Sequence, residues 1–242
     1  MVRAGDAFGH ALLDWARGGT LAETIERDDR FQTSGAGPSV YLSGIRGWPA
    51  AERQALRLVR GRVIDVGCGA GRVALVLQQR GFDVVAMDQS ALALKAAELL
   101  RVKNRRRSSI EQLSRDIGGF DTVILFGNNF GLFETPAHAR ELLTQWAVRA
   151  KPGTRILAES TSAYFAAPAM DRHYYRQNRL RRVAPGELRA RYRYADVESA
   201  WFRWLFVSRF EMRQIVRGTG WRMTQVLGSS PSEPYVAVLE KP

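Results

Sequence analysis

The pattern of hydrophobic and polar positions changes near residue 62. Residues 1–60 are predominantly polar and helical in pattern, with a loop-like interruption at 34–38, and the proline after Trp48 predicts a helix over 49–60. From residue 62 onward, short apolar runs alternate with amphipathic segments, which is typical of a parallel α/β sheet. The apolar runs predict strands at 63–66, 83–87, 106–109, 120–126 and 154–158.

Residues 161–207 interrupt this alternation. Within them, residues 188–194 alternate with a period of two and residues 201–206 form an aromatic run, so these two segments predict an inserted β-hairpin. Capping residues predict where the longer helices begin. These residues are Ser90, Thr135 and Ser208, the last of which forms a capping-box sequence with Glu211.

Two further apolar runs, at 220–227 and 235–240, predict the last strands of the sheet. The expected organisation is therefore one domain over residues 1–242. Within this domain, residues 1–60 are expected to form an N-terminal helical cap and residues 161–207 an inserted lid or hairpin.

The composition narrows the class of protein. With 242 residues, 45% of them hydrophobic, the chain has enough apolar content for a large core. Its single cysteine, Cys68, excludes an internal disulfide and any multi-cysteine metal site, and the three histidines lie too far apart for a local metal motif. No apolar run approaches the roughly 18 residues that span a bilayer, and no signal peptide is recognisable. We expect a metal-free protein of the cytoplasm.

The positive charge is concentrated in two segments. The 36 basic and 24 acidic residues give a formal charge of +12. Residues 101–115 hold six basic residues and one acidic residue, and residues 171–194 hold eight and two, which leaves +1 for the rest of the chain. Only four of the 36 bases are lysines. This arginine excess is typical of a GC-rich coding bias, so the charge by itself does not indicate a nucleic-acid partner.

The segment that carries chemistry is VIDVGCGAGR at 63–72, a predicted strand followed by a glycine-rich turn and a helix start. Its three glycines allow a sharp turn and a close approach to a ligand. Asp88 ends the next strand, 21 residues after Gly67, where a carboxylate can bind both hydroxyls of a ribose. A tight turn without a ligand is the alternative, but the glycines and the spaced acid together favour a nucleotide-like ligand.

The glycine spacing is G-x-G-x-G, and Arg72 occupies the third glycine position of the dinucleotide fingerprint. The segment resembles motif I of the class I S-adenosylmethionine-dependent methyltransferases, which is close to D-x-G-C-G-x-G. The resemblance covers nearly the whole chain from residue 48, including the turn at 151–153 and the Gly-Trp…Tyr-Val-Ala-Val-Leu ending. It implies a Rossmann-like α/β fold with seven strands, mostly parallel with a reversed last strand, and helices on both faces.

The same resemblance implies S-adenosylmethionine as cofactor and assigns roles to particular positions. The glycine turn would face the methionine portion, with Cys68 lending its backbone. The acid after the second strand would bind the ribose, and its neighbour would lie near the adenine. Ser109 stands where the family usually has an aspartate for the adenine amino group. A Gly-Asn pair would lie beneath the sulfonium. In chain order, these residues are Asp65, Gly67, Cys68, Gly69, Asp88, Gln89, Ser109, Ile110, Gly127 and Asn128.

Methyl transfer depends mainly on positioning, and a general base is needed only when the acceptor arrives protonated. Candidate residues near the predicted strand ends are Asn128, Asn129, Glu159, Tyr164 and His173. For Glu159, a general base and a solvated or salt-bridged acid at the rim are equally compatible with the sequence. Asn128 and Asn129 are more typical of residues that shape a turn and hold the cofactor. His173 is more typical of an amphipathic surface helix.

The predicted hairpin would lie above the carboxyl ends of the strands. Its first strand places arginines on one face and Ala190, Tyr192 and Tyr194 on the other. Aromatic walls with a cationic rim suit a flat or anionic small acceptor. A solvated arginine face that protects an edge strand is the alternative.

Three functions remain open at this stage. The first is methyl transfer to an oxygen or nitrogen of a small molecule. The second is an RNA or DNA methyltransferase that uses the basic segments, although Asn128-Asn129-Phe130 lacks the prolines of the amino-directed nucleic-acid enzymes and no appended RNA-binding domain is visible. The third is a cofactor-binding protein of the same fold that transfers no methyl group. The acceptor, the attacked atom and the oligomeric state do not follow from the sequence.

Overall fold

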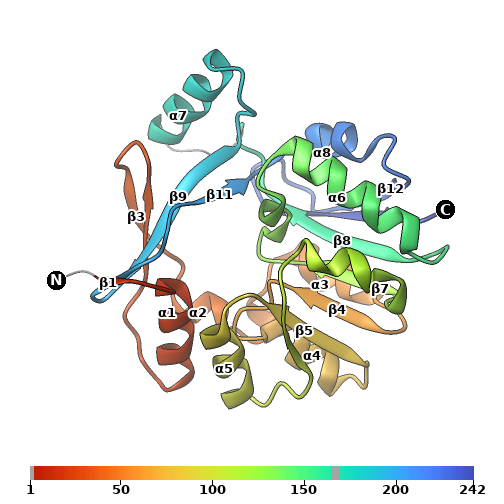
Figure 1. Cartoon of the computed structure of the whole chain (residues 1–242), viewed down its shortest axis with the longest axis horizontal. Coiled ribbons are helices and arrows are strands. Elements are labelled where there is room, and N and C mark those ends of the chain that lie inside the picture. The colour runs from red at the N-terminus through yellow and green to blue at the C-terminus, as the bar shows by residue number, and fades with distance from the viewer. Residues whose placement is uncertain (1–2, 165–168) are drawn as a thin grey trace. The chain divides into compact units, whose positions relative to one another are not determined.

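The computed structural model describes residues 3–164 and 169–242 and contains two β-sheets (Figure 1). The first sheet has seven strands, namely β4 (Val63–Val66), β5 (Val84–Asp88), β6 (Arg105–Arg107), β7 (Thr122–Leu125), β8 (Arg155–Ser160), β12 (Arg222–Leu227) and β13 (Tyr235–Glu240). Their spatial order is β12-β13-β8-β7-β4-β5-β6.

The directions of these strands match the sequence-based prediction. β4, β7 and β8 are paired in parallel, and so are β5 and β6. β13 is antiparallel to both β8 and β12, which makes it the reversed last strand. β4 and β7 are buried at all four of their positions, as expected for central strands of a sheet covered on both faces. The predicted seven-stranded α/β fold is confirmed.

The second sheet combines strands of the N-terminal segment with strands from residues 187–205. They are β1 (Arg3–Ala4), β2 (Thr24–Arg27), β3 (Gln32–Ser34), β9 (Glu187–Tyr194), β10 (Val197–Glu198) and β11 (Phe202–Leu205). The order is β1-β10-β9-β2-β3, and β11 also pairs with β9. The two strands of the predicted hairpin are therefore present as β9 and β11, but they belong to a larger sheet that includes N-terminal strands.

The N-terminal segment corrects one expectation. It contains the helices α1 (Ala7–Ala16), α2 (Pro38–Tyr41) and α3 (Ala50–Ala55), but β2 and β3 lie between α1 and α2. The prediction that residues 1–60 are a helical cap is thus wrong for residues 24–34. β2 is antiparallel to β9 over Thr24–Arg27, and this partner lies more than 160 residues away in the sequence. Such non-local pairing overrides the local pattern.

The remaining helices are α4 (Arg72–Gln79), α5 (Ala91–Leu99), α6 (Pro136–Arg149), α7 (Ala169–Leu180) and α8 (Arg209–Val216). Of these, α5, α6 and α8 begin where the capping residues predicted, whereas α4 begins after Gly71 without a side-chain cap. Ser90 accepts a hydrogen bond from Ala93 N at the start of α5, Thr135 caps α6, and Ser208 and Glu211 form the complete capping box of α8. In the part of the chain that the structure describes, no helix has the length and hydropathy needed to cross a membrane.

The described residues divide into two compact units. The first unit, called unit 1 below, draws on Met1–Trp48, Gly67–Ser109 and Arg189–Phe202. The second, unit 2, draws on Pro49–Val66, Ile110–Leu188 and Arg203–Pro242. The expectation of a single domain over residues 1–242 stays a prediction.

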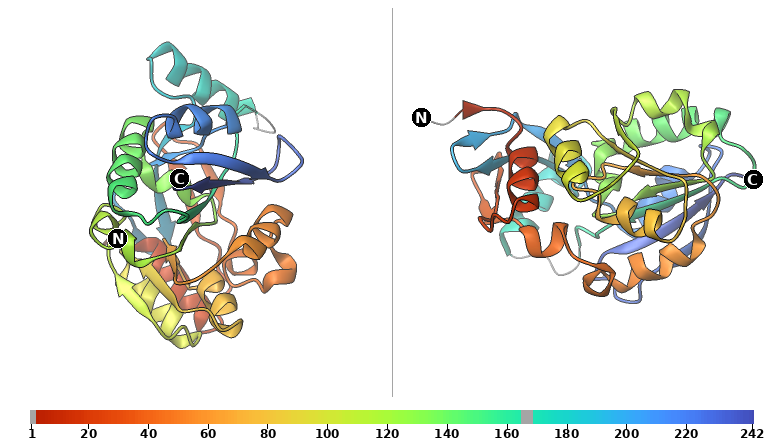
Figure 2. Two further views of the ribbon diagram at one scale, coloured as in Figure 1. Left: turned by 90° about the vertical axis from the view of Figure 1, so that its right-hand side faces the viewer. Right: turned by 90° about the horizontal axis from the view of Figure 1, so that it is seen from below.

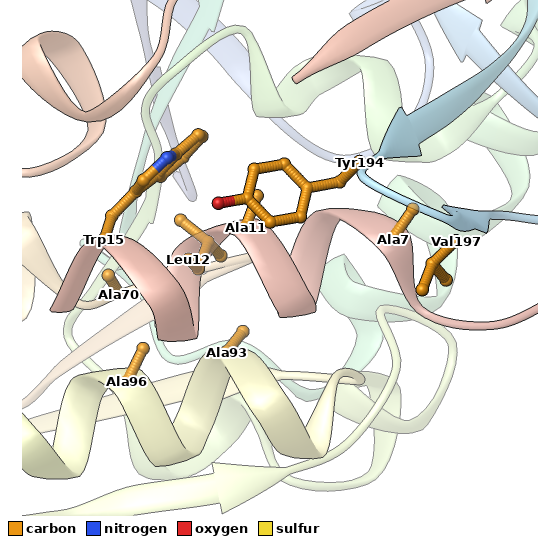
Figure 3. Close-up of a cluster of buried hydrophobic side chains, with 9 residues drawn as sticks. All are labelled: Ala7, Ala11, Leu12, Trp15, Ala70, Ala93, Ala96, Tyr194 and Val197. Carbon is orange, nitrogen blue, oxygen red and sulfur yellow. The ribbon is translucent and has the colours of Figure 1, made fainter. Parts of the chain in front are cut away.

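In unit 1, α1 packs along α5 through small side chains. Figure 3 shows Ala93 and Ala96 of α5 on one side of α1, and the rings of Trp15 and Tyr194 on its other side. Each of the two α5 alanines is at most 1% exposed. Alanine at the contact allows the two helices to approach closely, and the aromatic rings then cover the opposite face of α1.

In unit 2, β8 lies between β7 and β13, and α8 packs against both α6 and β12. Figure 2 shows β12 and β13 as adjacent blue strands beside the C-terminus. Trp221 anchors the start of β12, because its indole N–H donates to the carbonyl of Leu143 in α6 (2.8 Å) in a buried position. This hydrogen bond fixes the start of β12 to α6.

Candidate cofactor site

The glycine-rich turn after β4 has the geometry that its sequence predicts. Gly67, Gly69 and Gly71 all adopt positive φ angles, of 68°, 55° and 82°. The backbone N–H groups of Gly67 and Cys68 both donate to the carbonyl of Met87 (2.8 and 3.0 Å) at the end of β5. The turn is therefore fixed to the carboxyl end of the next strand.

Gly71 is required for packing as well as for conformation. A Cβ atom at this position would lie 2.6 Å from Cγ2 of Val102 and 3.3 Å from Cβ of Ala97. At Gly69, by contrast, the nearest atom would be 3.5 Å away, an ordinary contact with Leu12. Gly71 thus lets α4 start close to α5, whereas Gly69 is needed for its backbone conformation.

Asp88 joins the glycine turn to the start of α5. One carboxylate oxygen accepts from Gly69 N (2.9 Å) and the other from Ser90 N (2.9 Å). The Asp88 carbonyl accepts from Ser108 N (3.0 Å), which connects the same residue to the segment after β6. Each carboxylate oxygen keeps a further acceptor position for a ligand hydroxyl.

The environment of Asp88 raises the pKa of its carboxyl group. Burial is the largest cause, and the negative charge of Asp6 adds to it. The N–H groups of Ser90 and Gly69 act in the opposite direction, because they stabilise the ionised form. Any additional hydrogen-bond donor that a ligand supplies would further stabilise the ionised form of Asp88.

Asp6 is a residue of this region that the sequence analysis missed. It caps α1 by accepting from Gly9 N (2.8 Å), and its second carboxylate oxygen accepts from the hydroxyl of Ser90. Ser90 in turn accepts from Ala93 N (2.9 Å). The starts of α1 and α5 are therefore tied together next to Asp88. The signal was an ordinary N-cap aspartate, and only the fold reveals its second partner.

The residues assigned to the adenine differ in exposure. Gln89 is exposed, and its carbonyl accepts from Nε of Arg107 (3.1 Å). Ser109 is half-buried and Ile110 is buried. Ser109 directly follows Ser108, whose N–H donates to the Asp88 carbonyl. In unit 1, Gly69, Asp88 and Ser109 therefore lie at the same edge, at the carboxyl ends of the strands.

In unit 2, a tight turn follows β7. Gly127 and Asn128 are both left-handed, with φ of 72° and 61°. The Asn128 side chain accepts from the hydroxyl of Thr161 (2.6 Å), and the Asn129 amide donates to the carbonyl of Val66 (2.8 Å) at the end of β4. The side chains of both asparagines are thus engaged in holding the turn.

Glu159 has a structural role in the same turn. It is 2% exposed and accepts from Gly127 N (2.6 Å). The interpretation as a solvated acid at the rim is therefore wrong, because the side chain is buried and binds the backbone of the turn. Asp65, in β4, is likewise 2% exposed. A Cβ atom at Gly127 would meet nothing within 4 Å, so this position faces open space.

The other acceptor candidates lie in different surroundings. His173 is exposed on α7, the surface helix that the sequence predicted. The Tyr164 hydroxyl donates to Glu211 (2.7 Å) in the capping box of α8. Burial and this carboxylate raise the pKa of Tyr164 to about 12, so its hydroxyl stays protonated at neutral pH.

The arginine face of β9 is paired with carboxylates. Arg191 and Arg193 each lie within 3.3 Å of oxygens of Glu26 and Glu198. On the opposite face, Tyr192 stacks between Phe8 and Phe202, at centroid distances of 4.6 and 5.1 Å. The predicted division of the strand into two faces is confirmed.

The residues present suit the nucleoside part of S-adenosylmethionine. Gly69 presents backbone without a side chain, and the Asp88 carboxylate has acceptor capacity for two hydroxyls. Among the described residues, no group of three or more histidine, cysteine, aspartate or glutamate side chains could hold a metal ion.

Comparison with known families identifies the class of protein. The sequence matches the family described as methyltransferase domain over residues 19–226. This match covers most of the chain, which therefore belongs to that family, with the class I S-adenosylmethionine-dependent fold. The resemblance inferred from the glycine motif is confirmed.

Individual solved structures agree with this class. A methyltransferase from Bacteroides fragilis, solved with S-adenosyl-L-homocysteine, superimposes with a TM-score of 0.80 at 23% identity, covering 98% of this chain and 94% of that one. The CcbJ methyltransferase from Streptomyces caelestis gives 0.59 at 15% identity, with 84% and 95% covered. These likenesses show the fold.

The curated relatives match shorter segments. Glycine N-methyltransferase from Mus musculus is 35% identical over 82 residues, 28% of each chain. Ubiquinone biosynthesis O-methyltransferase from Dechloromonas aromatica (strain RCB) is 30% identical over 109 residues, 43% of this chain and 45% of that protein. The matched segments thus span less than half the length of these relatives.

Proposed function

We propose that this protein transfers a methyl group from S-adenosylmethionine to a nitrogen or oxygen atom of a small molecule. One observation carries the proposal, namely the glycine turn whose Gly69 N–H is held by the carboxylate of Asp88 (2.9 Å). This contact brings a glycine backbone and an acid suited to bind ribose hydroxyls together at the carboxyl ends of two strands, where ligands bind in open α/β sheets.

The chemistry resides in the cofactor, whose sulfonium makes its methyl group electrophilic. The protein then has to bind and orient the cofactor and the acceptor and to exclude water. In unit 1, Asp88 would accept the ribose hydroxyls, the turn from Gly67 to Gly69 would support the methionine portion, and Gln89 and Ser109 would lie along the adenine.

For unit 2, the family resemblance assigns cofactor contacts to Asp65, Ile110, Gly127 and Asn128. Glu159 is expected to act as a positioning residue, because its carboxylate already binds Gly127 N and thereby sets the turn. Asn129 is expected to position the same turn through Val66. His173 lies exposed on α7 and is the weakest of the catalytic candidates.

The small-molecule class is supported by the relatives, which are named for methylating glycine and a ubiquinone precursor. An RNA or DNA substrate is less well supported, because Arg191 and Arg193 are already paired with Glu26 and Glu198. A non-catalytic cofactor-binding protein is the remaining alternative, and only an assay for transfer distinguishes it.

The test has two parts. Calorimetry should detect binding of S-adenosylmethionine and S-adenosylhomocysteine in the micromolar range typical of enzyme substrates. Methyl incorporation from labelled S-adenosylmethionine should then appear in the small-molecule fraction of a metabolite extract. Label in nucleic acid alone would favour the alternative substrate, and binding without any transfer would favour the non-catalytic protein. Tight NAD binding without binding of either sulfur compound would refute the proposal.

A further inference from the structure

Unit 1 contains a fully buried acidic side chain that is incompletely satisfied. Glu23, the residue before β2, is 0% exposed. One of its carboxylate oxygens accepts from Gly37 N (3.2 Å), whereas Oε1 has no hydrogen-bond partner among the residues that the structure describes. A buried carboxylate oxygen without a donor is costly, so its retention calls for a partner that the protein chain itself does not provide.

The loop that surrounds Glu23 is shaped to its carboxylate. A Cβ atom at Gly35 would lie 1.9 Å from Oε1, so only glycine admits the carboxylate here. Gly35 N also donates to the Glu23 carbonyl (2.7 Å), and Gly37 adopts a positive φ of 66°. The loop-like segment 34–38, which has no place in the cofactor site, thus encloses this side chain.

Aromatic rings from three segments of unit 1 gather around the same place. The ring of Tyr41 stacks on Trp15 (centroids 5.6 Å apart, planes at 10°) and lies edge-on to Phe8 (5.1 Å). Phe8 in turn stacks on Tyr192 (4.6 Å). Burial raises the pKa values of the Tyr41 and Tyr192 hydroxyls, and the nearby charge of Glu23 raises them further. The backbone places both phenols near Glu23. Gly37, which donates to Glu23, directly precedes the helix that ends at Tyr41, and Ile25, two residues after Glu23, pairs with Tyr192.

These two hydroxyls differ from that of their neighbour Tyr194. Tyr194 donates to Asp14 (2.5 Å). For Tyr41 and Tyr192, no hydrogen-bonded partner of the hydroxyl is found within the described ranges, and their pKa shifts come from burial and nearby charges alone. Glu23 Oε1 and the two phenols are consequently three polar groups, set among rings, that have no hydrogen-bond partner among the described residues.

This group lies next to the glycine turn. Arg72, the first residue of α4, follows Gly71 directly. Its guanidinium lies 4.6 Å from the ring of Trp48, and its charge lowers the pKa of Tyr41, in opposition to Glu23. Tyr41 and Tyr192 also pack against the buried cluster that includes Ala70 of the glycine turn, so this group lies beside that turn.

We infer that Glu23, with Tyr41, Tyr192 and the surrounding rings, binds the amino group of a cationic methyl acceptor. An ammonium group has three donors for the carboxylate and the phenols, and it is attracted to aromatic faces. A hydroxyl acceptor would leave the carboxylate charge uncompensated. The inference deepens the proposed function and rests on it for the identity of this ligand as the acceptor.

The test compares amines with alcohols of the same shape. The full-length protein, saturated with S-adenosylhomocysteine, is titrated with 2-phenylethylamine against 2-phenylethanol, propylamine against propanol, and 1,4-diaminobutane against 1,4-butanediol. At least one amine should bind ten or more times tighter than its alcohol. Glu23→Gln should abolish that preference while its affinity for S-adenosylhomocysteine stays unchanged.

Two further variants separate the role of the Glu23 carboxylate from general effects of substitution. Glu26→Gln makes the same chemical change three residues away, at a carboxylate that pairs with Arg191, and should retain the amine preference. Gly35→Ala leaves the Glu23 carboxylate in the sequence but displaces it, and should weaken amine binding. If no amine binds better than its alcohol, or if Glu23→Gln keeps the preference, the inference is wrong. Failure of the wild-type protein to bind S-adenosylhomocysteine would instead refute the proposed function.

Discussion

Replacing Asp88 by asparagine tests the cofactor site at its most constrained residue. Asparagine keeps the shape of the side chain but has one carbonyl oxygen where the carboxylate has two acceptor oxygens. In the protein, these two oxygens accept from Gly69 N and Ser90 N. The substituted side chain can satisfy one of the two N–H groups and must turn its own N–H₂ group toward the other.

The structure sets the size of the two expected effects. A hydrogen bond to a charged group contributes about 1.5–3 kcal/mol, so loss of one ribose contact lowers cofactor affinity at least about tenfold. The unsatisfied backbone N–H costs about 1–3 kcal/mol of folding free energy. Removing a buried charge that is repelled by Asp6 offsets part of this cost. Affinity should therefore fall more than stability.

Titration calorimetry with S-adenosylhomocysteine measures the affinity, and thermal unfolding followed by circular dichroism measures the stability. Asp83→Asn is the matched control, because Asp83 lies just before β5, away from the carboxyl end of that strand, and its substitution should leave the affinity unchanged. If Asp88→Asn is folded and binds S-adenosylhomocysteine as tightly as the wild type, the ribose does not lie at Asp88.

Four other perturbations test individual contacts. Folding raises the pKa of Asp88, so the contribution of this group to folding stability is fully present below its unfolded-state pKa and is lost as the pH rises through the folded-state pKa. The affinity for S-adenosylhomocysteine should change in the opposite sense and weaken as the pH falls through the same range. Calorimetry from about pH 7.5 to 4.5 would contradict this if the affinity stayed constant. Gly71→Ala should lower the folding free energy by more than about 1 kcal/mol in urea titrations, whereas Gly81→Ala, with a similar φ but open surroundings, should cost less; equal losses would show that packing against Val102 does not matter. Glu23→Gln should leave the melting temperature unchanged or raise it, because it removes a buried charge with an unpaired oxygen, and a large drop would mean that the carboxylate has a stabilising partner. Asn129→Ala should cost about 1 kcal/mol in the same urea titrations by leaving the carbonyl of Val66 without its donor, and a neutral result would assign that turn to Glu159 alone.

Local signals in the sequence correctly predicted the seven-stranded sheet and the starts of its helices. The capping box at Ser208 joins residues only three positions apart, and the positive φ of Gly67 is a property of a single residue. A short stretch of sequence is therefore enough to predict either feature. The apolar runs of β4 and β7 indicate central strands because a strand buried on both faces tolerates few polar side chains. The approach of Asp88 to the glycine turn was predictable for the same reason, since parallel neighbouring strands end at one edge.

The environment of individual polar side chains was decided by the tertiary structure. The sequence around Glu159 was compatible with a solvated rim acid, whereas in the fold its side chain is buried and binds Gly127 N. β2 could be recognised as a strand only through its pairing with β9. The surroundings of Glu23 depend on Tyr41 and Tyr192, which lie 151 residues apart in the sequence. Periodicity reports how a residue relates to its own helix or strand, whereas burial and charge depend on which distant segments pack against it. The sequence by itself therefore determined the class of cofactor site, and the fold alone determined that Oε1 of the buried Glu23 has no hydrogen-bond partner among the described residues.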